Sequence, residues 1–184
     1  MKFNSTPLPG VIHIELDVFR DARGYFLESY HQQKYAGAGI PGSFVQDNIS
    51  QSEKGTLRGL HAQLSHPQAK LVHVVSGKIW DVAVDIRPDS STFKKWYGLT
   101  LSDERPAQLY VPAGFAHGFC VLSDHAEVLY KCTDLYDPSN EIHLLWNDPD
   151  LAIVWPIQKP TLSPKDRDGV TLRQIESKLV ELSA

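Results

Sequence analysis

Cysteine, methionine and positive charge are all scarce in this chain of 184 residues. It has 2 cysteines and 1 methionine, and its 22 acidic side chains outnumber its 18 lysines and arginines. General nucleic-acid binding requires a basic surface, so the net charge of −4 argues against that function. The same charge permits a local cluster of cations, which is all that one small anion needs.

Long apolar runs are also missing. No stretch approaches the run of about 20 apolar residues that a membrane-spanning helix requires, and the segment from Met1 to Gly10 lacks a signal-peptide core. Cys120 and Cys132 are too few for a disulfide scaffold and have no metal-binding spacing, so we expect buried free thiols. These absences predict a soluble cytoplasmic protein with no membrane partner.

The composition that remains is typical of a globular protein, with 42% hydrophobic and 22% charged residues. A chain of 184 residues can bury a sizeable core as one domain. We find no internal repeat, low-complexity run or linker. We therefore expect a single domain over residues 1–184.

Short strands separated by turn residues dominate the chain. Segments 11–19 and 25–30 read as strands, and a series of strand-like segments follows from Leu57 to Leu129. The later predicted strands are 71–75, 79–86, 96–101, 108–111, 118–122 and 127–132. This pattern indicates an all-β sandwich or barrel, and a double-sheet jelly roll is one way to hide the strand edges.

Helices are predicted in only two places, a short one over 31–37 and a C-terminal one over 171–182. The polar segment 163–169 is predicted as a turn. Segment 44–50 is strand-like but contains three consecutive amide or carboxylate side chains, which are costly to bury unpaired. It is either an exposed edge or the lining of a polar cavity, and we slightly favour the edge.

Arg58 and His61, in the stretch Leu57-Arg58-Gly59-Leu60-His61, pair a fixed cation with a histidine. The ordinary pKa of histidine suits acid/base catalysis, so His61 is a candidate base. Tyr130 is a candidate proton donor, Asp166 a candidate partner that orients His61, and Lys70 a candidate stabiliser of an oxyanion. Each also has a plain structural explanation, as a core histidine, a buried phenol, a turn residue or a surface charge.

A Pro-x-Gly-x-x-His pattern from Pro112 to His117 resembles the second motif of cupin barrels, where that histidine often binds a metal. Cupin metal sites usually add a His-x-His pair, and the earlier histidines here, His61, His66 and His73, do not form one. A first-row metal needs about three convergent ligands. We therefore expect no metal, and a metal-dependent cupin enzyme using His117 remains the alternative.

Ordered motifs run along nearly the whole chain: Asp21 to Glu28, Gln46-Asp47-Asn48, Leu57 to His61, Gln68 to Val72, Asp81 to Arg87, Pro112 to Gly118, Leu129-Tyr130-Lys131 and Leu162 to Asp166. Together they resemble the dTDP-4-dehydrorhamnose 3,5-epimerase family. The resemblance implies a metal-free, cupin-type double-sheet jelly roll with a few short helices, assembled as a homodimer. It also implies cofactor-independent epimerisation of dTDP-4-dehydro-6-deoxy-D-glucose at C3 and C5 to dTDP-4-dehydro-L-rhamnose, in dTDP-L-rhamnose biosynthesis.

The resemblance further implies roles for individual residues. His61 is the base, Asp166 its partner and Tyr130 the acid, and Tyr136 stacks on the thymine. The other residues implied at the substrate site are Arg23, Glu28, Gln46, Asp47, Asn48, Arg58, Lys70, His117, Glu141 and Lys165.

The implied chemistry needs no cofactor because the substrate carries its own electron sink. A proton beside a ketone is acidic, since the carbanion spreads onto oxygen as an enolate, and the C4 ketone flanks both C3 and C5. Arg23, Arg58 and Lys165 are candidates to bind the diphosphate. The sequence leaves open a single 3- or 5-epimerase, a ketoisomerase on a related nucleotide keto sugar, and a non-catalytic nucleotide-sugar binding module.

Overall fold

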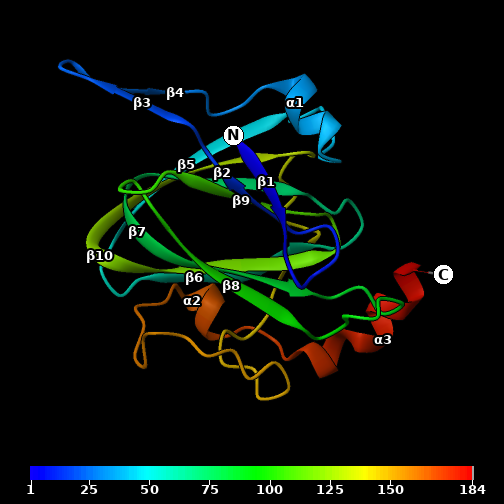
Figure 1. Ribbon diagram of the computed structural model, residues 1–184. Coiled ribbons are helices and arrows are strands. Elements are labelled where there is room, and N and C mark those ends of the chain that lie inside the picture. The colour runs from blue at the N-terminus through cyan, green and yellow to red at the C-terminus, as the bar shows by residue number, and fades with distance from the viewer. Residues whose placement is uncertain (184) are drawn as a thin grey trace.

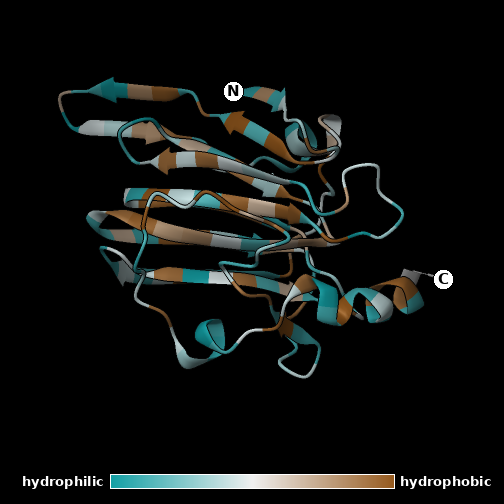
Figure 2. Cartoon of the chain, turned by 90° about the horizontal axis from the view of Figure 1, so that it is seen from below, coloured by the Kyte–Doolittle hydropathy of each residue, from teal (hydrophilic) through white to brown (hydrophobic). Residues whose placement is uncertain are grey.

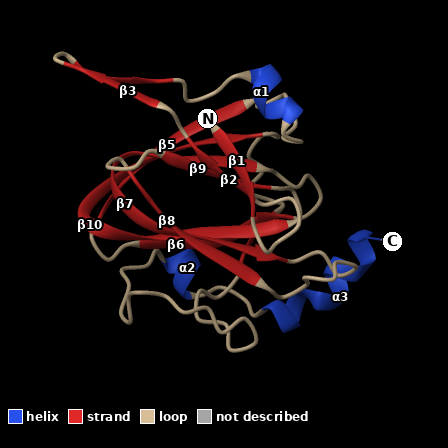
Figure 3. Ribbon diagram, viewed as in Figure 1, coloured by secondary structure: helices blue, strands red, loops and turns tan. Residues whose placement is uncertain are grey.

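The computed structural model describes residues 1–183, and strands are its main regular secondary structure (Figures 1 and 3). The strands are β1 (Lys2–Ser5), β2 (Ile12–Glu15), β3 (Val18–Asp21), β4 (Gly24–Leu27), β5 (Gln46–Glu53), β6 (Leu57–Gln63), β7 (Lys70–Asp85), β8 (Trp96–Ser102), β9 (Ala107–Val111), β10 (Phe115–Cys132) and β11 (Glu141–His143). The helices are α1 (Gln32–Gly37), α2 (Pro164–Arg167) and α3 (Leu172–Ser183). The prediction of a β-protein with a few short helices is confirmed.

Two long strands, β7 and β10, run through both layers of the molecule. The first part of β7 pairs with β9 and with the end of β10, whereas its second part pairs with β8 and with the start of β10. One layer therefore has the order β1-β2-β9-β7-β10-β5, and the other has the order β8-β7-β10-β6-β11. This is the double-sheet jelly roll that was expected.

The prediction from the sequence divided each of these long strands into two shorter ones. Segments 71–75 and 79–86 are parts of β7, and segments 118–122 and 127–132 are parts of β10. The turn-like residues between them form bends, with register shifts in the β7–β10 pairing, so the chain changes layer without leaving the sheet. In the opposite sense, predicted strand 11–19 is divided into β2 and β3.

Three groups of apolar side chains hold the layers together, and hydrophobic and hydrophilic residues alternate along many strands (Figure 2). The first group, which includes Val72 and Phe119, fills the interior of the jelly roll. The second packs one outer face against the C-terminal segment, including Leu172 of α3. The third packs the other outer face against α1, whose Tyr35 is fully buried. Cys120 and Cys132 are buried free thiols, as expected.

The predicted helices over 31–37 and 171–182 are confirmed as α1 and α3. The predicted turn 163–169 instead contains helix α2, because Ser163 caps its first turn and Pro164 occupies the first position. No helix within residues 1–183 is both long and apolar enough to cross a membrane.

Among residues 1–183, strand β5 pairs with β10 only, so it is an edge strand, as the sequence slightly favoured. One side of it is also polar and half-buried, because Gln46 and Asn48 lie on one face while Asp47 points away. Segment 44–50 is therefore an edge strand that also has one polar, half-buried face, so each of the two interpretations is correct in part.

Candidate active site

A cavity of about 380 Å³ is lined by residues of β5, β6, β7, β10, β11 and α2, a volume within the range of small-molecule sites. It brings together ten of the residues expected at the substrate site: Gln46, Asn48, Arg58, His61, Lys70, Tyr130, Tyr136, Glu141, Lys165 and Asp166. These residues are far apart in sequence, and the pairing of β6 and β5 with β10 places them around one space.

His61 and Asp166 form a close pair within this cavity. Nε2 of His61 lies 2.5 Å from Oδ1 of Asp166. The other carboxylate oxygen accepts a hydrogen bond of 2.7 Å from the Ser163 hydroxyl, and the Gly59 backbone N–H donates to Oδ1 at 3.4 Å. Because the Asp166 side chain is almost fully buried and multiply bonded, it holds the imidazole in one orientation.

Two opposing effects determine the charge on this pair. Burial alone would raise the pKa of Asp166, but the hydrogen bonds from His61 and Ser163 dominate and lower it to about 2. Burial lowers the pKa of His61, and the bond to Asp166 offsets this only in part. At neutral pH the pair is therefore an ionised carboxylate and a neutral imidazole.

Two glycines allow β6 to approach β10 closely beside His61. Gly59 has φ +119°, and a Cβ there would lie 2.6 Å from Cα of Gly118. A Cβ on Gly118 would in turn lie 2.8 Å from the Arg58 carbonyl oxygen. Side chains at either position would push the strands apart, so these glycines fix the position of His61 relative to β10.

Tyr130 and Lys70 supply the remaining acid/base groups. Burial raises the pKa of Tyr130, so this phenol keeps its proton at neutral pH. The ammonium group of Lys70 makes no hydrogen bond or ion pair with residues 1–183, and burial lowers its pKa despite the nearby Cys132 and Glu141. Both side chains therefore remain available to a bound molecule.

Other residues of the lining are fixed by hydrogen bonds at the wall of the cavity. Nε of Arg58 donates to the Ser52 hydroxyl at 2.8 Å. The Tyr136 hydroxyl donates to Oε2 of Glu141 at 2.8 Å, and its backbone N–H donates to Gln46 at 2.8 Å. The exposed Tyr136 ring is thus anchored at both its backbone and its hydroxyl.

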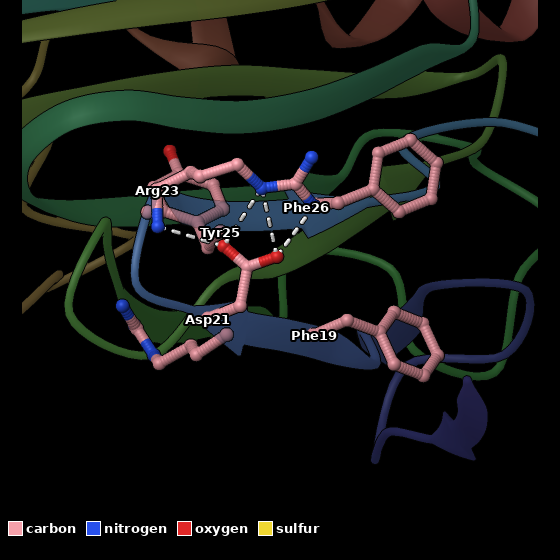
Figure 4. Close-up of a pocket in the computed structure, with 7 residues that line it drawn as sticks. Phe19, Asp21, Arg23, Tyr25 and Phe26 are labelled. Carbon is pink, nitrogen blue, oxygen red and sulfur yellow. Dashed lines mark hydrogen bonds and ion pairs between the residues drawn. The ribbon is translucent and has the colours of Figure 1, made fainter.

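The structure does not bring Arg23 and Glu28 to this cavity within one chain. Arg23 belongs to the β3–β4 hairpin, which projects from the body (Figure 1), and its guanidinium pairs with Asp21 at 2.5 Å (Figure 4). That hairpin lines a separate open hollow of about 530 Å³. Glu28 pairs with Lys34 at 2.7 Å.

Asp47 and His117 also lie outside the lining. Asp47 sits on the exposed face of β5 and pairs with Lys131 at 2.8 Å. His117 is the cross-strand neighbour of His61, but it is buried, and its Nε2 lies 3.0 Å from each carboxylate oxygen of Asp81. Within residues 1–183 no metal-capable cluster includes His117, so the donors of the metal-dependent alternative do not assemble around it.

Four lining residues escaped the sequence analysis: Gln68, Cys132, His143 and Ser163. Three of them stand two residues from an expected one, and alternate residues of an extended segment face the same side. Cys132 follows Tyr130, His143 follows Glu141, and Gln68 precedes Lys70 in this way. The fourth, Ser163, is the cap of α2, and a Ser-Pro-x-Asp pattern signals that position.

A jelly roll that encloses a His–Asp pair, a protonated phenol and an unpaired lysine defines an acid/base enzyme. The family model described as dTDP-4-dehydrorhamnose 3,5-epimerase matches residues 5–174. The chain therefore belongs to the dTDP-4-dehydrorhamnose 3,5-epimerase family, whose members are isomerases.

Individual relatives agree with this assignment. A dTDP-4-dehydrorhamnose 3,5-epimerase of Pseudomonas aeruginosa is 53% identical over 171 residues, covering 92% of this chain and 94% of the relative. One of Neisseria gonorrhoeae is 51% identical, and this chain spans 54% of its length. The crystal structure of the Legionella pneumophila epimerase with dTDP-4-keto-L-rhamnose matches with TM-score 0.94 and 46% identity, covering 97% of this chain and 96% of that one.

Proposed function

We propose that this protein epimerises dTDP-4-dehydro-6-deoxy-D-glucose at C3 and C5, giving dTDP-4-dehydro-L-rhamnose for dTDP-L-rhamnose biosynthesis, without a cofactor. The observation that carries the proposal is the neutral His61, bonded to an ionised Asp166, in the same cavity as the protonated Tyr130. A base and an acid from different strands are what inversion of a carbon beside a ketone requires.

His61 acts as the base through Nδ1. Because ionised Asp166 accepts the Nε2 proton, the neutral ring carries its lone pair on Nδ1. Nδ1 removes a proton from the carbon beside the C4 ketone, and the electron pair of the broken C–H bond moves onto the ketone oxygen as an enolate. The imidazolium that forms is stabilised by the Asp166 carboxylate.

Tyr130 returns a proton to the same carbon from the opposite face, which inverts it. The electron pair of the enolate takes up that proton, and solvent then reprotonates the tyrosinate and deprotonates His61. Lys70, which has no partner within the described chain, donates to the enolate oxygen while the charge is there. Because the C4 ketone flanks C3 and C5, the same groups serve both centres.

The remaining lining residues bind the nucleotide. Arg58 and Lys165 are the cations of the cavity that we assign to the diphosphate. Tyr136, an exposed ring anchored at the cavity wall, stacks on the thymine. Gln46 and Asn48 supply amide groups from β5.

We further propose a cytoplasmic homodimer in which the β3–β4 hairpin of one chain completes the cavity of the other. Three large aromatic side chains of this hairpin are mostly exposed: Phe19 by 63%, Tyr25 by 54% and Phe26 by 68%. Such a cluster of exposed apolar side chains is unfavourable in water and is typical of an interaction surface. Contact with a second copy would bury them. It would also carry Arg23, whose side chain is 90% exposed, to a site where it can bind substrate, with Glu28 following it along the chain.

The exchange of solvent hydrogen tests the reaction. In deuterated water the protein should place deuterium at both C3 and C5 of the keto sugar, and His61→Ala should abolish this exchange while thymidine diphosphate still binds. The exposed His125, at the bend of β10, serves as a matched control, and His125→Ala should exchange normally. Near-normal turnover by His61→Ala would disprove the base assignment.

The same experiment separates the alternatives. Deuterium at C3 alone would indicate a 3-epimerase, and thymidine diphosphate binding without any exchange would indicate a binding module. Activity that survives chelators would reject a metal-dependent enzyme.

A further inference from the structure

His143 is a cavity residue that the proposed reaction does not use. It is the cross-strand neighbour of His61, and the two rings meet edge to face with centroids 4.6 Å apart. Its Nε2 lies 3.1 Å from Oε2 of Glu141. Its Nδ1 is buried, has no hydrogen-bond partner, and lies 3.7 Å from Oδ1 of Asp166.

This arrangement leaves an unsatisfied electron pair beside a carboxylate. The negative charge of Glu141 favours the tautomer with the proton on Nε2, so Nδ1 presents its lone pair to Asp166. Two acceptors that face each other gain nothing, and buried polar atoms without partners are rare in proteins. A cation placed between them would satisfy both.

We propose that His61, His143 and Asp166 form a binding site for a zinc-like divalent transition-metal ion, and that the ion inhibits the enzyme. One ligand atom from each residue lies within 4.8 Å of the others. Two imidazoles and a carboxylate form a common zinc donor set, with a fourth position left for water. Here that position faces the cavity, and Glu141 supplies the outer carboxylate that orients a metal-bound histidine.

The metal and the catalytic base exclude one another. With zinc–ligand bonds of about 2.0 Å, ligand atoms on a tetrahedron are about 3.3 Å apart, so the 2.5 Å contact between His61 and Asp166 must open. The 3.7 Å separation of His143 from Asp166 is already near that spacing. When Nε2 of His61 binds the ion, its proton moves to Nδ1, and the lone pair that removes the substrate proton is lost. The inhibition, unlike the binding, rests on the proposed epimerase function.

Metal binding is measured on the full chain without substrate. Cobalt(II) should give the absorption bands of a tetrahedral site, and competition with a coloured chelator should show one zinc ion per chain. His143→Ala should remove the cobalt bands, and Glu141→Gln should weaken zinc binding by about 10–100-fold. His143→Gln provides a second variant if the alanine variant does not fold, and His125→Ala should bind as the unmodified protein does.

Deuterium exchange with and without zinc separates this inference from the proposed function. Zinc should stop exchange by the unmodified protein, and a chelator should restore it. A protein that exchanges normally but binds no zinc, or that binds it equally well after His143→Gln, overturns the metal site alone. A protein that binds zinc through His143 but never exchanges overturns the epimerase proposal and leaves the metal site standing.

Discussion

At the scale of the residue, Asp166 controls the behaviour of His61. Its hydrogen bonds hold its own pKa at about 2, so it stays ionised throughout the range in which His61 titrates. The negative charge of Asp166 raises the pKa of His61, but burial lowers that pKa by a larger amount. The pKa of His61 therefore lies below its ordinary value, and the imidazole that we propose as the base is neutral at neutral pH.

This balance predicts the pH dependence of the reaction. Activity should fall as the pH drops below the usual range of histidine, because protonated His61 cannot remove a proton. Asp166→Asn should lower kcat by roughly 10²–10⁴-fold, as expected for a group that stabilises the imidazolium. It should also move the acidic limb of kcat/KM to lower pH, because the largest influence that raises the pKa of His61 is removed.

A pH profile of kcat/KM for both proteins checks this prediction. Ser163→Ala is the matched control, because it removes one hydrogen bond from Asp166 but leaves its charge, and it should have a smaller effect. A limb that moves to higher pH in Asp166→Asn would contradict the assigned balance.

The charge of Asp166 also contributes to stability. Because its pKa falls from an ordinary 3.8 to about 2 on folding, the stabilising contribution is fully present above pH 3.8. It is lost as the pH falls through the lower value. Chemical unfolding of the unmodified protein between pH 5 and about pH 2 should therefore show a steeper decline than that of Asp166→Asn, in which the other carboxylates with lowered pKa values, such as Asp85, still contribute.

At the scale of the element, the bends of β7 and β10 decide the architecture. Gly77 lies at the bend of β7 with φ +84°, and a Cβ there would collide with the His125 carbonyl oxygen and lie 2.6 Å from the Ser123 hydroxyl. The two long strands therefore cross between layers at a point where only glycine fits. Without that crossing, β6 and β5 could not both pair with β10 around one cavity.

Gly77→Ala should consequently destabilise the fold much more than a comparable change elsewhere. Gly39→Ala is a matched control, because Gly39 has φ +83° but no atom within 4 Å of the added Cβ. Both variants carry the backbone strain, and Gly77→Ala adds the collision, which should cost about 2 kcal/mol more. Urea unfolding of the two variants measures the difference, and equal losses would show that the close approach at Gly77 is unimportant.

At the scale of the whole molecule, the contacts within a single chain do not account for the projecting β3–β4 hairpin. Its three large aromatic side chains (Figure 4) are exposed, and its Arg23 does not line the cavity of the same chain. If the hairpin completes the cavity of a second chain, Arg23→Ala should reduce kcat/KM by about 10–100-fold, the value of a charged hydrogen bond. Light scattering should show dimers for this variant.

Mixed dimers test whether Arg23 serves the partner. When Arg23→Ala and His61→Ala chains are refolded together at equal amounts, random pairing should restore about a quarter of the sites, because half of the dimers are mixed and one site in each is intact. A mixture of His61→Ala and Tyr130→Phe is the control, since both changes lie in one cavity and cannot complement. No recovery in the first mixture would place Arg23 in its own chain's site or outside both.

Taken by itself, the sequence determined what can be read from neighbours along the chain. The alternation of apolar residues predicted most of the strands, a terminating glycine indicated α1, and helical spacing predicted α3. Ordered motifs indicated the family and ten residues of the cavity. These signals are local, because side-chain direction in a strand depends only on the backbone repeat.

Tertiary structure decided the rest. Whether Gly77 ends a strand or bends it depends on what lies across the sheet, and no local pattern records that. Asp47 and His117 do not line the cavity because each pairs with a residue distant in sequence. The partner of Asp47 is Lys131, and that of His117 is Asp81. His143 joins His61 and Asp166 only because β11 pairs with β6 while α2 packs beneath it, and long-range pairing alone sets such distances.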